Sequence, residues 1–205
     1  MKTITELKTQ VKNKKRVSVY LDGAYYCGLD TATVLKNRLK VGMEIDEKNL
    51  IEIQKESELQ ACFDSALTFI SGAIKTEREV YQKLVKKGYL PEICSLAVEK
   101  VKSYGYLDDG DYAKRYVSTY AKTKGKRLIG LQLKQKGVSD EQVEQAVLEI
   151  ENQGETAKII AEKYLKNKQV DRKILQKCYK YLLSKGFDYD DAKYAISSYD
   201  DEDLN

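Results

Sequence analysis

The side chains best placed for chemistry in this sequence are positive charges that recur along its second half. The first group is Lys122, Lys124, Lys126 and Arg127, and the second is Lys163, Lys166, Lys168, Arg172 and Lys173. Lys134 and Lys136 lie between the two groups. Residues 120–187 contain fifteen Lys or Arg and eight Asp or Glu, a net charge of +7, against +4 for the whole chain. We predict that these cations bind a polyanionic or acidic partner, although any one lysine can serve solubility alone.

Catalytic and metal chemistry have little support in the sequence. The chain contains no histidine, which is the commonest acid–base residue. It also lacks the glycine loops that bind phosphates and the motif around a nucleophilic serine, so only carboxylate catalysis remains as an enzymatic alternative. None of the four cysteines forms a CxxC pair, and we expect no metal and no cofactor. The carboxylates at 108, 109 and 111 are better explained as helix caps than as metal ligands.

The elements that must position the cations are indicated by a repeated helix ending. The pattern Leu-x-x-Lys-Gly occurs at 84–88, 133–137 and 182–186, so its glycines are 49 residues apart both times. Glycine ends helices because it adopts a positive φ without a Cβ clash. Equal spacing of one helix ending indicates an internal repeat.

Apolar positions keep the same 49-residue offset and divide each repeat into three amphipathic helices. Four residues before the leucines stand Val80, Ile129 and Cys178. A later face shows the helical spacing i, i+3, i+4, i+7. In the second copy this face is Val143, Ala146, Val147 and Ile150. The predicted fold class is therefore mainly α, with three tandem three-helix repeats, each with its own core.

Residues 1–45 have a different pattern, typical of strands. Val17 to Leu21 alternates with period two, Asp22-Gly23 is a hairpin turn signal, and Ala24 to Leu29 forms the return strand. We expect a further strand over 4–11, a short helix over 31–39 and a last short strand before Asp46, which can cap the next helix. Whether that helix continues through Leu59 into the first repeat is open.

The predicted organisation has five parts. A strand-containing α+β cap with a linking helix occupies 1–57. The three-helix repeats occupy 58–105, 106–152 and 153–199, and an acidic tail occupies 200–205. Capping boxes at Thr76–Glu79 and Ser139–Gln142 mark helix starts, and the only proline, Pro91, suits the first turn of another helix.

Composition sets the expected setting of the protein. The four thiols fit a reducing cytoplasm, and we expect no signal peptide, no membrane span and a monomer. Sixteen tyrosines accompany three phenylalanines and no tryptophan. Tyrosine suits either the edge of a core or stacking on a partner, and for most of them we favour the core edge.

The sequence resembles the RecX family of regulators of the RecA recombinase over about 58–199. The resemblance is strongest at Gly105-Tyr106-Leu107-Asp108-Asp109, at Tyr112, Tyr116 and Gly125, and from Ile129 to Gly137; it is weak over 1–45. It implies a bacterial regulator without catalytic residues, which lies in the helical groove of the RecA filament on single-stranded DNA and limits recombination. Interface residues are not carried over, and the cations above follow from charge alone.

Two other functions remain open at this point. Three-helix units with basic turns also occur in helix-turn-helix proteins that bind DNA directly. A repeat scaffold for an unrelated acidic protein is the third alternative. Binding to free DNA and to the RecA filament, measured on one sample, separates the three.

Overall fold

The structure, a computed structural model, describes residues 1–11 and 13–200, with no side chain for residue 200. Its contacts define two compact units. Unit 1 comprises residues 1–74 and 80–107, and unit 2 combines residues 75–79 with the chain from 108 onward. Apart from the backbone of residue 200, the acidic tail predicted over 200–205 lies outside the described residues.

Unit 1 begins with a four-stranded antiparallel sheet in the order β3-β2-β1-β4. The strands are β1 (Lys2–Thr9), β2 (Arg16–Leu21), β3 (Ala24–Asp30) and β4 (Glu44–Ile45). Inward side chains alternate along β2, where Val17, Val19 and Leu21 are buried. Asp22 and Gly23 both have positive φ, as the predicted two-residue hairpin requires.

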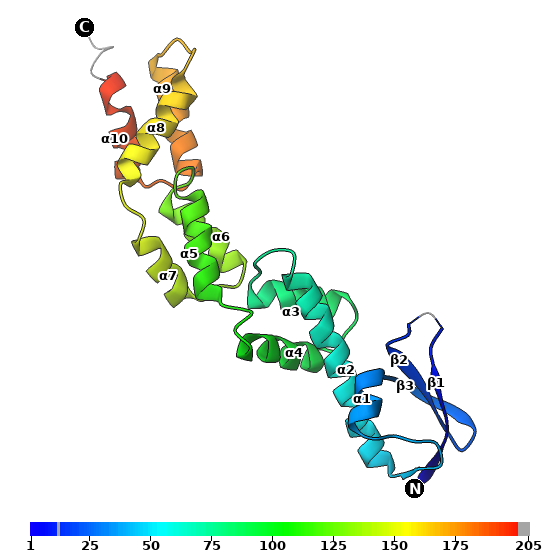
Figure 1. Cartoon of the computed structure of the whole chain (residues 1–205). Helices are drawn as coiled ribbons and strands as arrows, with labels where there is room; N and C mark the ends of the chain where they lie inside the picture. Colours follow the sequence, from blue (N-terminus) through cyan, green and yellow to red (C-terminus); the bar gives the residue numbers. More distant parts are fainter. Residues whose placement is uncertain (12, 201–205) are drawn as a thin grey trace. The chain divides into compact units, whose positions relative to one another are not determined.

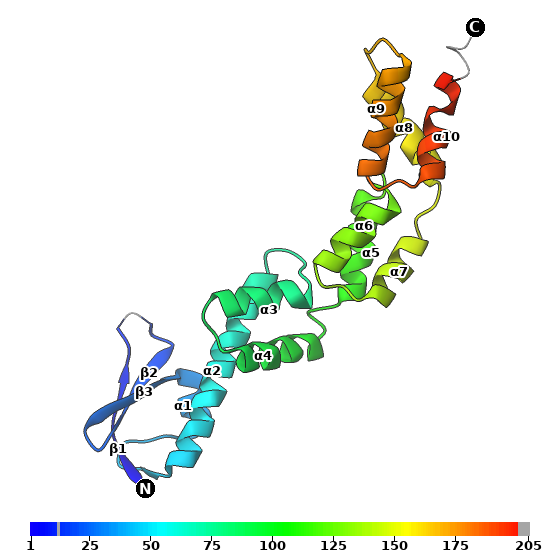
Figure 2. The same cartoon turned by 180° about the vertical axis from the view of Figure 1, so that it is seen from behind.

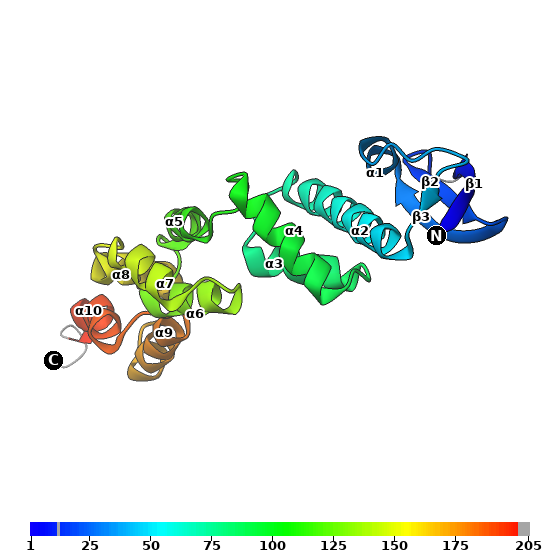
Figure 3. The ribbon, with the colours of Figure 1, turned by 90° about the horizontal axis from the view of Figure 1, so that it is seen from below.

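Two helices pack against the sheet of the cap (Figure 3). Asp30 caps α1 (Thr31–Lys36) through a 2.8 Å bond from the Ala32 N–H. This helix is shorter than expected because Arg38 takes a left-handed conformation. The next helix, α2 (Glu47–Ile70), runs unbroken through Leu59. Asp46 has the extended backbone of a cap but makes no capping bond with its side chain, so the side-chain part of that prediction is wrong.

The repeats are built as the sequence pattern predicts, with three helices each (Figure 1). The second half of α2 belongs to repeat 1, with α3 (Glu77–Lys86) and α4 (Pro91–Ser103). Repeat 2 contains α5 (Asp109–Tyr120), α6 (Lys126–Gln135) and α7 (Asp140–Leu148), and repeat 3 contains α8 (Gln153–Leu165), α9 (Arg172–Ser184) and α10 (Tyr189–Asp200). The second helix of each repeat ends at a glycine with φ of +91°, +96° or +89°.

Each repeat buries its own core, and the cap buries a fourth. Leu84, Leu133 and Leu182, the leucines of the repeated helix ending, are all fully buried. Separate small cores are the expected energetics of a repeat array, in which each unit is stabilised by its own packing and by its neighbours.

Helix caps follow the sequence signals closely. Asp108 accepts the Asp111 N–H at 2.9 Å, Ser139 accepts the Gln142 N–H at 3.3 Å, and Asp171 accepts the Ile174 N–H at 2.7 Å. The carboxylate of Asp109 accepts the Glu77 N–H at 3.0 Å. Asp108 therefore caps the helix that it opens, as predicted, whereas Asp109 holds the N-terminus of α3.

Repeats 2 and 3 meet where the backbone of one helix end touches the start of another helix. The Gly125 N–H donates to the Lys185 carbonyl at 2.9 Å, and the Arg127 N–H donates to the Gly186 carbonyl at 3.2 Å. The segment 75–79 makes the corresponding contact with repeat 2, because Thr76 Oγ1 donates to the Lys136 carbonyl at 2.7 Å. Thr76 and Gly125 are equivalent positions, 49 residues apart, and so are Lys136 and Lys185. The same pair of repeat positions therefore meets twice within unit 2, once through a side-chain hydroxyl and once through a backbone N–H.

Candidate nucleic-acid interface

The basic junction of repeat 2 lies in the turn between α5 and α6. Lys122, Lys126 and Arg127 are exposed there, whereas Lys124 is half-buried. Lys124 donates to Gln132 Oε1 at 2.8 Å, and its Nζ lies 3.8 Å from the centre of the Tyr120 ring. Three of the four predicted cations are thus free to meet a partner, and the fourth is held against an aromatic surface.

Lys134 and Lys136 already have acidic partners. Lys134 pairs with Asp140 at 2.8 Å on the surface. Lys136 is half-buried and pairs with Glu79 at 2.7 Å. The hydrogen bond that Lys136 donates to Glu79 raises the pKa of Lys136 in spite of the opposing effect of burial. Burial acts to raise the pKa of Glu79, but the hydrogen bonds from Lys136 and the Thr76 N–H outweigh it and lower that pKa.

The cations of repeat 3 are divided between two places. Lys163 lies on α8, while Lys166, Lys168, Arg172 and Lys173 lie in or beside the connection from α8 to α9. This connection is at the end of the two helices away from α6 (Figure 2). Lys166, Lys168, Arg172 and Lys173 are therefore separated from the basic junction of repeat 2 by the length of α8 and α9.

Tyrosines and lysines bridge this separation, beginning on repeat 2. Tyr112, Tyr116 and Tyr120 follow one face of α5, with ring centres 6.1 Å and then 4.5 Å apart. The Tyr116 hydroxyl bonds Gln132 Oε1 at 2.8 Å, and the same oxygen accepts from Lys124. Burial, with a smaller contribution from Tyr120, raises the pKa of Tyr116. Lys136 Nζ lies 5.7 Å from the Tyr112 ring at the other end of the row.

The row continues on repeat 3. Tyr164 of α8 and Tyr181 of α9 stack with ring centres 4.8 Å apart and planes inclined by 24°. Lys168 Nζ lies 3.3 Å from the Tyr164 ring centre, and Lys185 Nζ lies 5.3 Å from that of Tyr181. Burial, with a smaller effect from the charge of Lys185, lowers the pKa of Lys124. The backbone of Lys185 lies next to that of Gly125 at the repeat junction, because the Gly125 N–H donates to the Lys185 carbonyl.

We call these residues the tyrosine–lysine stripe. Its members, in spatial order, are Lys136, Tyr112, Tyr116, Tyr120, Lys124, Lys185, Tyr181, Tyr164 and Lys168. All five tyrosines are half-buried, so each ring is partly packed and partly accessible. The arrangement combines positive charge with partly exposed aromatic rings, and charge and aromatic rings are the two features that bind single-stranded nucleic acids.

A groove of about 340 Å³ adjoins the stripe at the junction of repeats 2 and 3. Its lining residues are Lys122, Thr123, Ile160, Lys163, Tyr164, Tyr181 and Lys185. Three of these seven are lysines and none is acidic. None of the ion pairs found in the described part of the chain joins these lysines to a carboxylate. The groove therefore favours an anionic ligand.

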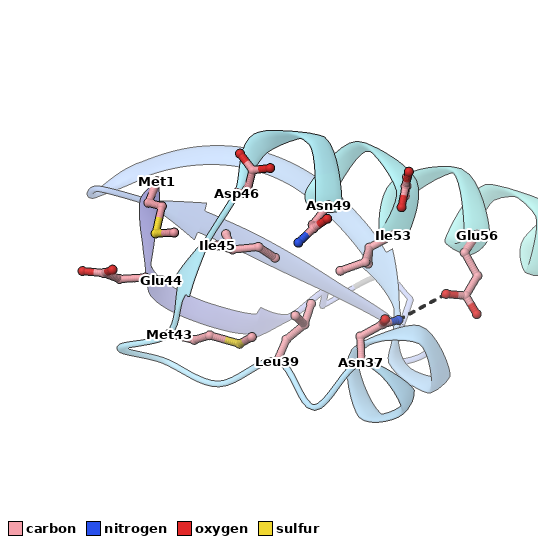
Figure 4. Close-up of a pocket in the computed structure, with 11 residues that line it drawn as sticks. Met1, Asn37, Leu39, Met43, Glu44, Ile45, Asp46, Asn49, Ile53 and Glu56 are labelled. Carbon is pink, nitrogen blue, oxygen red and sulfur yellow. Dashed lines mark hydrogen bonds between the residues drawn. The ribbon is translucent and has the colours of Figure 1, made fainter.

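The larger pocket, of about 510 Å³, lies in the cap and has the opposite character (Figure 4). Met43, Leu39, Ile45 and Ile53 form its apolar part. Its rim carries the carboxylates of Glu44, Asp46, Glu52 and Glu56, and no Lys or Arg lines it. Negative charge at the rim makes this pocket unsuitable for a polyanion. Among the described residues, no group of His, Cys, Asp and Glu side chains could hold a metal ion.

The comparisons with known proteins cover almost the whole chain. Residues 2–46 match the regulatory protein RecX N-terminal domain. Residues 62–100, 108–147 and 151–196 match the first, second and third RecX three-helix domains. The regulatory protein RecX of Clostridium botulinum (strain Alaska E43) is 35% identical over 196 residues, covering 93% of this chain and 92% of that protein. The chain belongs to the RecX family.

Solved RecX structures have the same fold. One crystal structure of regulatory protein RecX aligns with a TM-score of 0.74 at 27% identity, covering 98% of this chain and 100% of that one. RecX from Lactobacillus salivarius aligns with a TM-score of 0.62 at 28% identity, over 70% of this chain and 97% of the other. The resemblance noted in the sequence is thus confirmed, and it extends to the cap, where the motifs were weak.

Sequence reasoning missed Lys185 and the five tyrosines of the stripe. It selected Lys122, Lys124 and Lys163 but not Lys185, and it left the tyrosines among core-edge residues. The spacing of Tyr112, Tyr116 and Tyr120 at i, i+4, i+8 was a usable signal, because that spacing lines one helix face. No local signal pairs Tyr164 with Tyr181. In the described parts of both units, no helix is long and apolar enough to span a membrane.

Proposed function

We propose that this RecX-family protein binds the RecA filament on single-stranded DNA and lowers recombinase activity without turning over a substrate itself. Family membership supports the regulatory role. The main support for the proposed binding surface is the tyrosine–lysine stripe of repeats 2 and 3 together with the groove beside it. Positive charge suits both the DNA of the filament and acidic groups on the protein around it.

The repeat architecture supports a helical partner. Repeat 3 contacts repeat 2 at Gly125 and Arg127, and repeat 2 contacts the equivalent segment 75–79 at Thr76. The joints use equivalent positions, so successive repeats can present equivalent surfaces. A filament also presents equivalent surfaces in succession, one for each subunit. Docking in the helical groove of the filament therefore allows each repeat to meet one step of the partner.

The regulatory activity is tested by ATP hydrolysis. RecA hydrolyses ATP on single-stranded DNA, and we expect the full-length protein to lower that rate in proportion to filament occupancy. The protein alone should hydrolyse no ATP. An unchanged RecA rate at saturating protein, together with no sedimentation with the filament, would refute the proposal.

The surface is tested by charge-matched triple variants. We expect Lys122→Ala/Lys126→Ala/Arg127→Ala and Lys166→Ala/Arg172→Ala/Lys173→Ala each to weaken filament binding, because the altered side chains are exposed. The control, Lys8→Ala/Lys14→Ala/Lys15→Ala, removes three exposed cations from the cap. If three phosphate contacts are lost, the salt dependence on single strands should fall by about 2, at about 0.7 per contact. Equal weakening by the control would exclude a special role for repeats 2 and 3.

A further inference from the structure

The tyrosine–lysine stripe combines lysine ammonium groups with tyrosine rings, and a single ligand that binds it must contact both. Along its central part, lysine ammonium groups lie over half-buried tyrosine rings, at 3.8 Å for Lys124 on Tyr120 and 3.3 Å for Lys168 on Tyr164. The groove beside it adds Lys122 and Lys163. A ligand that fits must carry repeated negative charge and flat faces at intervals.

We propose that the stripe is a binding site for single-stranded DNA, in which bases stack on Tyr120 and Tyr164 and phosphates contact Lys122, Lys124, Lys163 and Lys185. The choice of DNA as the nucleic acid rests on the proposed function. The choice of a single strand rests on the geometry of the stripe.

Other polyanions use only half of these groups. In duplex DNA the base faces are stacked on each other, so the tyrosine rings have nothing to contact. An acidic peptide supplies carboxylates for the lysines but no regular series of flat rings. Single-stranded DNA supplies a phosphate and a π-face at every nucleotide, and aromatic side chains beside a basic groove are the usual way in which proteins bind it.

The lysines that cover the rings do not block such a ligand. A cation–π contact makes a modest contribution to stability, whereas a stacked base contributes about tenfold in affinity or more. A base can therefore displace the ammonium from the Tyr120 or Tyr164 face. The displaced lysine remains beside the ring, where the adjacent phosphate lies.

The stripe also has the construction of a preformed site. Gln132 Oε1 accepts from the Tyr116 hydroxyl at 2.8 Å, which fixes that ring in the middle of the repeat 2 portion. Stacking of Tyr164 on Tyr181 fixes the rings of repeat 3. Backbone bonds from Gly125 and Arg127 join the two portions. Little side-chain ordering is left for the ligand to impose, which favours affinity.

The test uses the full-length protein without RecA. Anisotropy of a labelled thymidine oligonucleotide of about 16 nucleotides, the upper range of known single-strand sites, measures binding. An abasic strand with the same number of phosphates separates stacking from charge. We expect the thymidine strand to bind at least about tenfold more tightly than the abasic strand and than a duplex of equal length. Equal affinity for the thymidine and abasic strands would overturn the inference.

Ring-removing variants locate the stacking. Tyr120→Leu/Tyr164→Leu should lose about ten- to a hundredfold in affinity for the thymidine strand and almost none for the abasic strand. The matched Tyr120→Phe/Tyr164→Phe variant keeps the rings and should retain binding. Tyr189→Leu removes an exposed tyrosine outside the stripe and should change nothing. If Tyr189→Leu loses as much affinity for the thymidine strand as the double Leu variant, the stripe is not the stacking site and the inference is wrong.

Intrinsic fluorescence gives a second reading of the same contact. The chain has sixteen tyrosines and no tryptophan, so its emission comes from tyrosine alone. Stacked thymines should quench part of this emission in the wild type, and less in the double Leu variant. Absence of quenching at saturation contradicts the inference. Tighter binding to an equal uridine strand of RNA than to thymidine DNA would reassign the site to RNA and overturn the choice of DNA.

The outcome is distinguishable from that of the proposed function. If the protein binds no free single strand but still lowers RecA hydrolysis, the stripe inference fails and the regulatory proposal stands. If it binds the thymidine strand through the two tyrosines but leaves RecA unaffected, the stripe inference stands and the regulatory proposal fails.

Discussion

The contact between repeats 2 and 3 depends on two glycines that approach each other more closely than any side chain allows. A methyl group at Gly125 would lie 2.2 Å from the carbonyl group of Gly186. A methyl group at Gly186 would lie 2.3 Å from Leu128 Cβ and 2.4 Å from the Leu128 nitrogen. Backbone atoms cannot rotate away as a side chain can. Alanine at either position must therefore separate the two repeats.

The two glycines differ in backbone conformation, so the cost of each alanine substitution can be assigned to left-handed strain, to overpacking or to both. Gly186 has φ of +89°, whereas Gly125 has an ordinary φ of −77°. Gly88 is the equivalent glycine of repeat 1, with φ of +91° and nothing within 4 Å of an added methyl group. Gly88→Ala should cost only the left-handed strain, about 1–2 kcal/mol. Gly125→Ala should cost only overpacking, about 1–3 kcal/mol, and Gly186→Ala about 2–5 kcal/mol, the sum of both.

Urea unfolding followed by far-ultraviolet circular dichroism measures these free energies. Hydrogen exchange gives a local readout, because the Gly125 and Arg127 amides donate across the contact to Lys185 and Gly186. Both amides should lose protection in Gly186→Ala, and the Arg127 amide also in Gly125→Ala, whereas Gly88→Ala should leave both unchanged. If Gly186→Ala is no more destabilising than Gly88→Ala, the close approach carries no energy and the reasoning is wrong.

Three further predictions concern the cores and the titrating groups. Leu133→Ala should cost about 2–5 kcal/mol in urea unfolding because Leu133 is fully buried, whereas Leu131→Ala, at 53% exposure, should change stability by about 0.5 kcal/mol or less. The pKa of Glu79 is lowered in the folded state, so its carboxylate stabilises the fold at pH above the ordinary Glu value of about 4.3. This contribution disappears as pH falls through the folded pKa. An acid titration of thermal stability should therefore show a smaller loss in Glu79→Gln than in the wild type. All four cysteines are buried, and burial raises the pKa of Cys27 to about 11 and of Cys62 to about 12, so a thiol reagent at pH 8 should react far more slowly with native protein than with protein in urea. Rapid reaction of all four thiols in native protein would contradict the burial of the cores.

Most of the fold could be predicted because its signals act over short distances. A helix face is set by apolar residues three and four apart, a cap by a residue within one turn, and a helix ending by one glycine with positive φ. Val80, Leu133 and Gly137 therefore have the burial and conformation that their positions indicated. The side-chain cap at Asp46 failed because an extended residue before a helix can hold the cap geometry through its backbone alone.

The candidate site was only partly predictable, for the opposite reason. Lys122 and Lys163 were selected by charge, but the groove that joins them exists only where two repeats meet. Tyr164 and Tyr181 are seventeen residues apart, on different helices, and Lys124 reaches the neighbourhood of Lys185 through the backbone contact at Gly125. Such pairs depend on how helices pack, which residues within a single turn do not specify.

The sequence by itself therefore determined three things about this protein: the helices, their threefold repetition at 49 residues, and the positive charge of residues 120–187. Each depends on local periodicity or on composition. Only the tertiary structure decided that Gly125 and Gly186 touch, and that tyrosines from α5, α8 and α9 join one row of lysines. The physical reason is that a repeat fixes its own core, whereas its outer face acquires neighbours only when the next repeat packs against it.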